Sequence, residues 1–148
     1  MREPLEIRKR LESATYQSLE AMMEAYAKAA TEMGHDRYQR KLNFSAESVD
    51  ALDEIVVLAS ENPGLDVEFE ARLWGSYLGE VVRRRYAGSW EMETYPGGTA
   101  AVPAVRVRGS LLFPVMKVYR RMTMGEEDDL QSFFAMVAER LGRPAQVN

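Results

Sequence analysis

The chain has 148 residues, a length typical of one domain with a substantial core. Apolar residues make up 46% and charged residues 28%, as in an ordinary soluble globular protein. No apolar run approaches the roughly 20 residues that span a bilayer, and residues 1–6 lack the apolar segment of a secretory signal. We therefore expect a cytoplasmic protein with no membrane partner. The absence of cysteine excludes disulfides and thiolate metal sites.

The net charge of −4 is distributed unevenly along the chain. Residues 1–66 carry 8 basic and 13 acidic side chains, residues 67–125 carry 9 and 5, and residues 126–148 carry 2 and 5. The segment charges are therefore −5, +4 and −3. A basic middle third folded against acidic flanks explains this pattern more simply than an anionic partner does. Because the whole chain is acidic, we expect no nucleic-acid partner.

Apolar residues at helical spacing predict one long helix from Pro4 to Met33, about 45 Å long. Pro4 suits its first turn and Gly34 the position after its last turn. The apolar stripe is rich in methionine and consists of Leu5, Leu11, Tyr16, Leu19, Met22, Met23, Tyr26, Ala30 and Met33. If one half of this helix extends beyond the domain, its stripe needs a second copy to cover it. The sequence therefore suggests a homodimer through the N-terminal helix, with a monomer as the alternative.

The next predicted elements are a very short strand at Leu42–Phe44 and a helix over residues 46–61 with Ser45 as its N-cap. The buried stripe of this helix is predicted to be Val49, Leu52, Ile55, Val56 and Ala59. Its water-facing acidic residues are predicted to be Asp50, Asp53 and Glu54. With Glu47 these carboxylates could hold a divalent cation, although a solvated acidic face is the commoner explanation. We therefore expect neither a metal nor a cofactor.

The most informative segment is residues 66–87, a predicted helix that is apolar almost all round. Such a helix has to be covered on most sides, so we expect it at the centre of the fold. Glu80 falls within its apolar arc and requires a partner. The candidate cations are Arg84, Lys117 and Arg120. Gly75 and Gly79, with GxxxG spacing, predict the close approach of another element.

Alternation of apolar and charged residues predicts a β-hairpin of residues 89–95 and 102–108, with Gly98-Thr99 at its tip. The predicted cross-strand pairs are Trp90 with Val107, Met92 with Val105, and Glu91 with Arg106. Because a lone hairpin is marginally stable, we expect a third strand, and Leu42–Phe44 is the best candidate.

Two helices are predicted to follow the hairpin. The first begins near Phe113-Pro114 and stops at Gly125. Its apolar residues are Met116, Tyr119 and Met122, and its basic residues are Lys117, Arg120 and Arg121. The second begins after the acidic run 126–129 and ends at Gly142, and its core face consists of Leu130, Phe133, Phe134, Val137 and Leu141. Residues 143–148 are predicted to form a frayed tail. The fold class is thus a mainly helical α+β single domain over residues 1–148, with a long helix at 1–34 and a compact core at 42–142.

Several motifs carry a family resemblance. They are LNFSAESVDALD at residues 42–53, YLGEVV at 77–82, Trp90, FPVMKVYRR at 113–121 and GEED at 125–128. Together they resemble a family of small, stand-alone bacterial domains of unknown function. The resemblance covers residues 42–137 and leaves the first helix outside. It implies one compact domain and, because that family has no assigned activity, it implies no reaction.

The residues available for catalysis are few. His35 is the sole histidine and lies in a predicted polar loop, where a local capping role is a simpler explanation than acid–base chemistry. No phosphate-binding, dinucleotide-binding, serine-hydrolase or zinc-protease motif occurs. Glu80 is better explained by a structural ion pair than by a catalytic acid, because no nucleophile or second acid can be paired with it.

The sequence therefore favours a non-enzymatic protein-binding domain, such as an immunity-type or regulatory adaptor protein, with no assigned catalytic residue. Its candidate binding residues are Glu80, Arg84, Trp90, Lys117, Arg120 and Arg121. Two alternatives stay open. One is small-ligand or nucleic-acid binding through the basic residues. The other is a small enzyme that uses Glu80 in an open pocket.

Overall fold

The computed structural model describes residues 4–142, which form a mainly helical α+β domain, as predicted. In chain order its elements are α1 (Pro4–Ser13), α2 (Leu19–Tyr38), α3 (Ser48–Ser60), α4 (Val67–Tyr86), β1 (Ser89–Thr94), β2 (Ala101–Val107), β3 (Ser110–Leu112), α5 (Pro114–Met124), the short 3₁₀ helix η1 (Gly125–Asp128) and α6 (Leu130–Leu141). The tail predicted at residues 143–148 lies outside the described residues.

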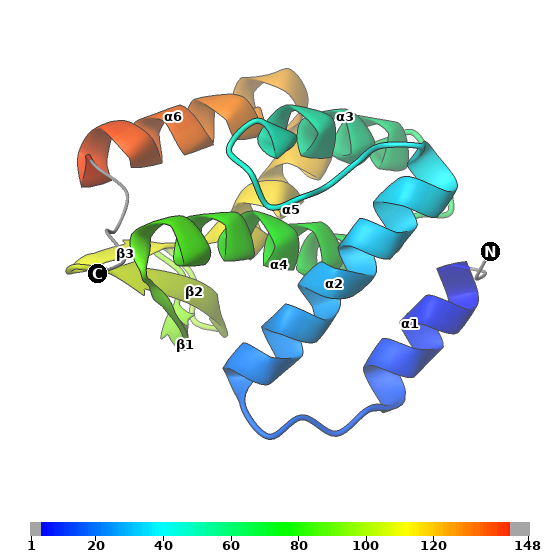
Figure 1. Ribbon diagram of the computed structural model, residues 1–148, viewed down its shortest axis with the longest axis horizontal. Coiled ribbons are helices and arrows are strands. Elements are labelled where there is room, and N and C mark those ends of the chain that lie inside the picture. Colours follow the sequence, from blue (N-terminus) through cyan, green and yellow to red (C-terminus); the bar gives the residue numbers. More distant parts are fainter. Residues whose placement is uncertain (1–3, 143–148) are drawn as a thin grey trace.

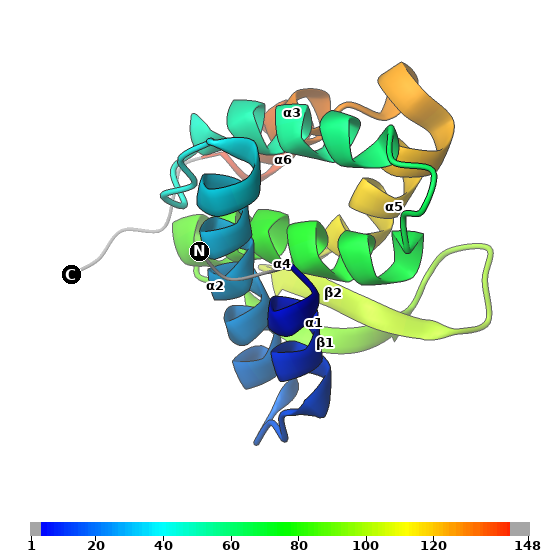
Figure 2. The same cartoon turned by 90° about the vertical axis from the view of Figure 1, so that its right-hand side faces the viewer.

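Helix α4 lies at the centre of the fold, as its apolar circumference predicts. In Figures 1 and 2, α3 and α6 lie on one side of it and the β-hairpin on the other, while α2 crosses it. Its residues 73–82 are all buried. A β-carbon at Gly75 would lie 2.5 Å from Cα of Val115 in α5, and one at Gly79 would overlap the indole ring of Trp90. The close approach predicted from the GxxxG spacing is therefore confirmed.

The prediction of one long N-terminal helix is wrong. The chain breaks between α1 and α2, and α1 folds back beside α2 (Figure 1). Ser18 begins α2, because its side-chain Oγ accepts a hydrogen bond from Ala21 N at 3.0 Å. The Tyr16 hydroxyl donates to the Leu11 carbonyl at 2.8 Å and fixes the turn. Hydroxyl side chains offer the backbone an alternative to helical bonds, and folding back lets α1 bury its apolar side in the same chain.

The far end of α2 also differs from prediction. Gly34 and His35 lie within the helix, which continues to Tyr38 and ends at Gln39 with a left-handed φ of 55°. Gly34 packs closely against the following loop rather than capping the helix, because a β-carbon there would lie 2.9 Å from Leu42 Cδ1 and would push that side chain aside.

The apolar stripe of the N-terminal region is largely covered within one chain. Leu11, Met23, Tyr26 and Met33 are at most 3% exposed, and Leu5, at 77%, is the large exception. The uncovered stripe that led us to expect a homodimer is therefore absent from this part of the structure.

The sheet is antiparallel with strand order β1-β2-β3. Trp90 pairs with Val105 and Met92 with Pro103, two residues away from the predicted register. A shift of two keeps every side chain on its predicted face, and Arg106 still forms an ion pair with Glu91, now diagonally. The third strand is β3 rather than Leu42–Phe44, because the two-residue turn Arg108-Gly109, with φ of 55° and 111°, makes a tight second hairpin. Leu42–Phe44 is instead part of the loop before α3.

Helix α3 has the predicted buried stripe, but it begins at Ser48 rather than at residue 46, and its N-cap is Glu47 rather than Ser45. The Ser45 side chain accepts a hydrogen bond from Ser48 N at 3.1 Å and so stabilises the turn that precedes the helix. The expectation that Asp53 faces water is wrong, since it is 7% exposed. In α5 the buried residues are Pro114, Val115, Val118 and Arg121, whereas Met116 and Met122 are half-buried and Tyr119 is exposed. In α6, Leu130, Val137 and Leu141 are buried as predicted, whereas Phe133 and Phe134 are half-buried.

Candidate functional site

Glu80 is fully buried, as predicted, and its carboxylate is saturated with donors. Arg83 donates from Nε to Oε2 at 2.5 Å and from Nη2 to Oε1 at 2.9 Å. Arg84 Nε donates to Oε1 at 3.1 Å, and Trp90 Nε1 donates to Oε2 at 2.8 Å. Arg84 was a predicted partner. Arg83 and Trp90 were not, although Arg83 lies one helical turn from Glu80.

The electrostatics of this cluster are those of a structural ion pair. Burial raises the pKa of Glu80, but the hydrogen bonds from Arg83 and Trp90 and the charges of Arg83 and Arg84 outweigh it and lower the pKa below its usual range. Arg84 also lies over the Phe44 ring, 3.8 Å from its centroid. With all these donors in place, the carboxylate has no open side from which to exchange a proton with a substrate.

Arg121 belongs to a second buried cluster, separate from Glu80. Its guanidinium makes two hydrogen bonds of 2.9 Å to the two oxygens of Asp53. The Asp53 Oδ1 atom also accepts from Leu130 N at 3.0 Å. This arrangement joins α3, α5 and the start of α6, and it leaves Arg121 9% exposed. The role of Arg121 is therefore to hold helices together.

Lys117 and Arg120 lie at a third place, on a cavity of about 410 Å³ bordered by β3, α5 and α6. Arg140 and the rings of Tyr95, Phe113 and Phe133 also line it. The predicted binding residues are therefore divided among three locations rather than gathered on one face.

A groove of about 510 Å³ that the sequence did not predict lies on another part of the surface. Helices α2, α4 and α5 and the hairpin border it, and it is hereafter the methionine groove. Its lining residues are Met22, Glu68, Ala71, Arg72, Met92, Ala101, Val102, Pro103, Val115, Met116 and Tyr119. Met92 is 47% exposed and Tyr119 is 37% exposed. Met22, Met92 and Met116 come from three different elements, so no local pattern could have grouped them.

Within residues 4–142, no three His, Cys, Asp or Glu side chains are placed so that they could hold a metal ion. The acidic face of α3 is divided, because Asp53 binds Arg121 whereas Glu54 binds Arg40 Nε at 2.8 Å on the surface. The described helices also include none with the length and apolar character of a membrane span.

Comparison of the chain with protein-family models, with curated proteins and with solved structures gives no match. The resemblance to a domain of unknown function therefore stays a prediction.

Proposed function

We propose that this chain is a non-enzymatic, cytoplasmic protein-binding domain and that the methionine groove holds the apolar face of a partner helix. The observation that carries the proposal is the exposure of Met92 and Tyr119 beside a groove of about 510 Å³. Exposed apolar surface that is concave and continuous is typical of an interaction site.

The composition of the groove favours a protein partner. Unbranched methionine side chains adapt their shape to an incoming surface and are common where binding surfaces re-pack. Glu68 and Arg72 lie on the α4 side of the groove and are both exposed, so the groove offers one charge of each sign beside its apolar floor. An amphipathic helix, with apolar anchors three or four residues apart and polar flanks, matches this arrangement.

The hydrogen bonds of Glu80 weigh against the enzyme alternative. Glu80 was its proposed acid, and each oxygen of Glu80 accepts two hydrogen bonds. Nucleic-acid binding through the basic residues loses its support as well, because Arg121 and Arg84 are engaged with Asp53 and Glu80. An immunity-type or regulatory adaptor role remains the specific form of the proposal.

The homodimer is not retained. Of the large apolar residues in α1, only Leu5 is exposed, and one side chain is too little to form a stable interface.

A capture experiment with matched variants tests the proposal. The tagged chain is used to capture partners from its native host, in parallel with Met92→Glu, Tyr119→Glu and Met124→Glu. Met124 is 61% exposed at the end of α5 and lies outside the methionine groove, so it controls for a charge added to an exposed methionine. We expect one partner to be retained by wild type and Met124→Glu and lost by the two groove variants. Equal capture by all four chains would contradict the proposal.

A further inference from the structure

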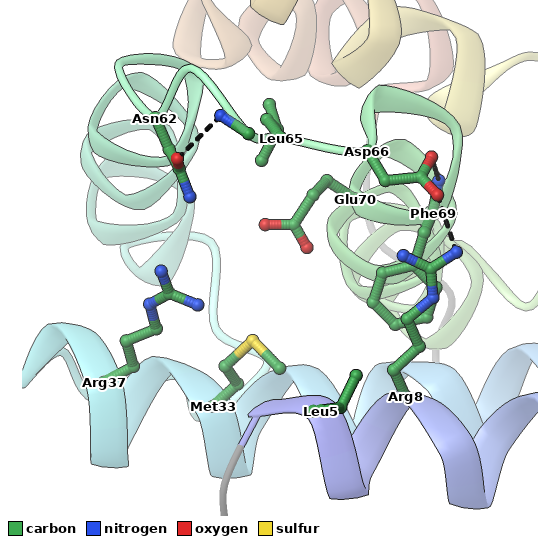
Figure 3. A pocket seen from close by; sticks show the side chains of 10 residues that line it. Leu5, Arg8, Met33, Arg37, Asn62, Leu65, Asp66, Phe69 and Glu70 are labelled. Carbon is green, nitrogen blue, oxygen red and sulfur yellow. Dashed lines mark hydrogen bonds and ion pairs between the residues drawn. The ribbon is translucent and has the colours of Figure 1, made fainter.

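A small cavity lies between α1, α2 and the start of α4, away from the methionine groove. Its volume is about 170 Å³, and Figure 3 shows the side chains that surround it. Glu70 of α4 points into this cavity from one side. The side chains of Arg37, from α2, and Asn62, from the α3–α4 loop, lie together on the opposite side.

Glu70 is a buried carboxylate that lacks a charged partner. The residue is only 8% exposed, and no ion pair to it is found among residues 4–142. The Trp74 Nε1 atom, one turn further along α4, favours the ionised form of Glu70 as a hydrogen-bond donor, but the contact falls short of an ordinary hydrogen bond and leaves Nε1 itself unsatisfied. Buried charges in proteins are usually paired with an opposite charge, so a carboxylate that faces a cavity with so little support calls for an explanation.

The neighbouring charges do not supply the missing partner. Arg8 is held by Asp66 at 2.6 Å and by Glu12, and its guanidinium lies over the Phe69 ring. Arg37 is exposed and acts on Glu70 through its charge, but the two side chains are beyond ion-pair distance. A space bounded by an unpaired carboxylate and a guanidinium therefore remains open between them.

We propose that this cavity binds a small zwitterion, an α-amino acid of the size of glycine, alanine or serine, with its ammonium group at Glu70 and its carboxylate at Arg37 and Asn62. The Asn62 Oδ1 atom already accepts from Gly64 N at 2.9 Å, which leaves the Asn62 amide NH₂ as the group able to donate. A guanidinium is well suited to bind a carboxylate through two hydrogen bonds.

Charge and size select this ligand class. The cavity is lined by two cations, Arg8 and Arg37, and two carboxylates, Asp66 and Glu70, so a ligand with no net charge fits best. A simple cation would meet two guanidinium groups, and a simple anion would leave Glu70 unpaired. A water molecule occupies about 30 Å³ in the liquid, so the cavity has room for about six non-hydrogen atoms. Met33, Leu65 and Phe69 provide an apolar wall for a short side chain.

Titration calorimetry and amide NMR of the full chain test this proposal with glycine, L-alanine and L-serine at up to tens of millimolar. Ethylammonium and propionate serve as half-ligands, each with one of the two charges. We expect saturable binding of an amino acid, with resonance shifts confined to residues 5–8, 33–37 and 62–70, and weaker binding of both half-ligands. Glu70→Gln and Arg37→Gln should each weaken binding by about tenfold or more, because each removes a charged hydrogen-bond partner.

Glu24→Gln in α2 and Arg85→Gln in α4 are the matched controls, since both charges are exposed and line neither this cavity nor the methionine groove, and both variants should bind as wild type does. Loss of binding cannot be attributed to unfolding in Glu70→Gln, because this variant removes a buried charge and should fold at least as well. The proposal is overturned if no amino acid binds, if Glu70→Gln binds with unchanged affinity, or if either half-ligand binds as tightly as alanine. None of these results bears on the methionine groove, which Met92→Glu tests separately.

Discussion

Replacing Asp53 by alanine should be among the most destabilising single changes in this chain. Asp53 joins three elements, since it binds the Arg121 guanidinium through both oxygens and accepts from Leu130 N. Asp53 and Arg121 are 7% and 9% exposed. Removing the carboxylate would therefore leave a guanidinium and a backbone N–H buried without a partner.

The magnitude follows from these stranded groups. Removing one partner of a buried ion pair lowers the stability by about 3–5 kcal/mol. An unsatisfied buried N–H lowers it by about 1–3 kcal/mol more where water cannot reach the group. We expect a loss of about 4 kcal/mol or more, against a total stability of about 5–15 kcal/mol for a domain. Glu54→Ala is the matched control, because Glu54 also binds an arginine from α3, but at the surface with 57% of its side chain exposed. Exposed pairs contribute about 0–1 kcal/mol.

Urea denaturation followed by circular dichroism measures the difference. With an m-value of about 2 kcal/mol per molar urea, the midpoint of Asp53→Ala should fall by about 2 M or more, and that of Glu54→Ala should barely move. Adding Arg121→Met to Asp53→Ala should recover part of the loss, because the stranded charge is then removed as well. If Asp53→Ala and Glu54→Ala have the same midpoint, the reasoning from burial is refuted.

Three further predictions concern α4 and the hairpin. Glu80→Ala should cost about 3 kcal/mol or more by stranding its cations, and a melting temperature equal to that of wild type would contradict the assignment of Glu80 as a buried structural acid. Gly79→Ala should lower the stability by about 1–3 kcal/mol, because its methyl group would overlap the indole ring of Trp90. Gly98→Ala in the hairpin turn is the control, since its β-carbon would lie 3.4 Å from the nearest atom. Thermal denaturation should show a clear loss for Gly79→Ala and almost none for Gly98→Ala. Burial raises the pKa of Glu70 above its ordinary 4.5, against the opposing charge of Arg37, so the stability of wild type should fall as pH rises through the folded pKa. Glu70→Gln should remove this slope and be more stable than wild type at pH 7, and equal pH profiles of the two chains would contradict the raised pKa.

The parts of the fold that could be predicted are those encoded within one element. The apolar circumference of α4 and the stripe of α3 follow from periodicity. The ends of α5 and α6 follow from Pro114, Gly125, the acidic run 126–129 and Gly142. The break before Ser18 was missed because apolar spacing continues on both sides of it. The cluster of Ser13, Thr15 and Ser18 was the local signal for that break.

The parts that could not be predicted depend on contacts between distant residues. Asp53 has exposed acidic neighbours along α3, and only its partner Arg121, 68 residues away, distinguishes it. For Glu70 a sequence signal did exist. Glu80 lies seven residues after Leu73 and Glu70 lies seven residues before Tyr77, so each falls about 20° from an apolar residue on the helical wheel. The same argument therefore applied to both glutamates. It predicts burial, but it cannot tell whether a partner is present.

The three acids Asp53, Glu70 and Glu80 are all buried. Their surroundings differ, and this difference distinguishes the two acids with a structural role from the one that could bind a ligand. Asp53 and Glu80 each receive an arginine and an N–H, which offsets the cost of removing the charge from water. Glu70 receives no arginine and only a weak contact from Trp74 Nε1, and it faces a cavity, so it lowers the stability of the empty chain. A ligand that supplied the missing ammonium group would bind the folded state alone and would recover that cost. Among these three carboxylates, Glu70 is therefore the one whose burial destabilises the empty protein and whose pairing with a ligand would offset that cost.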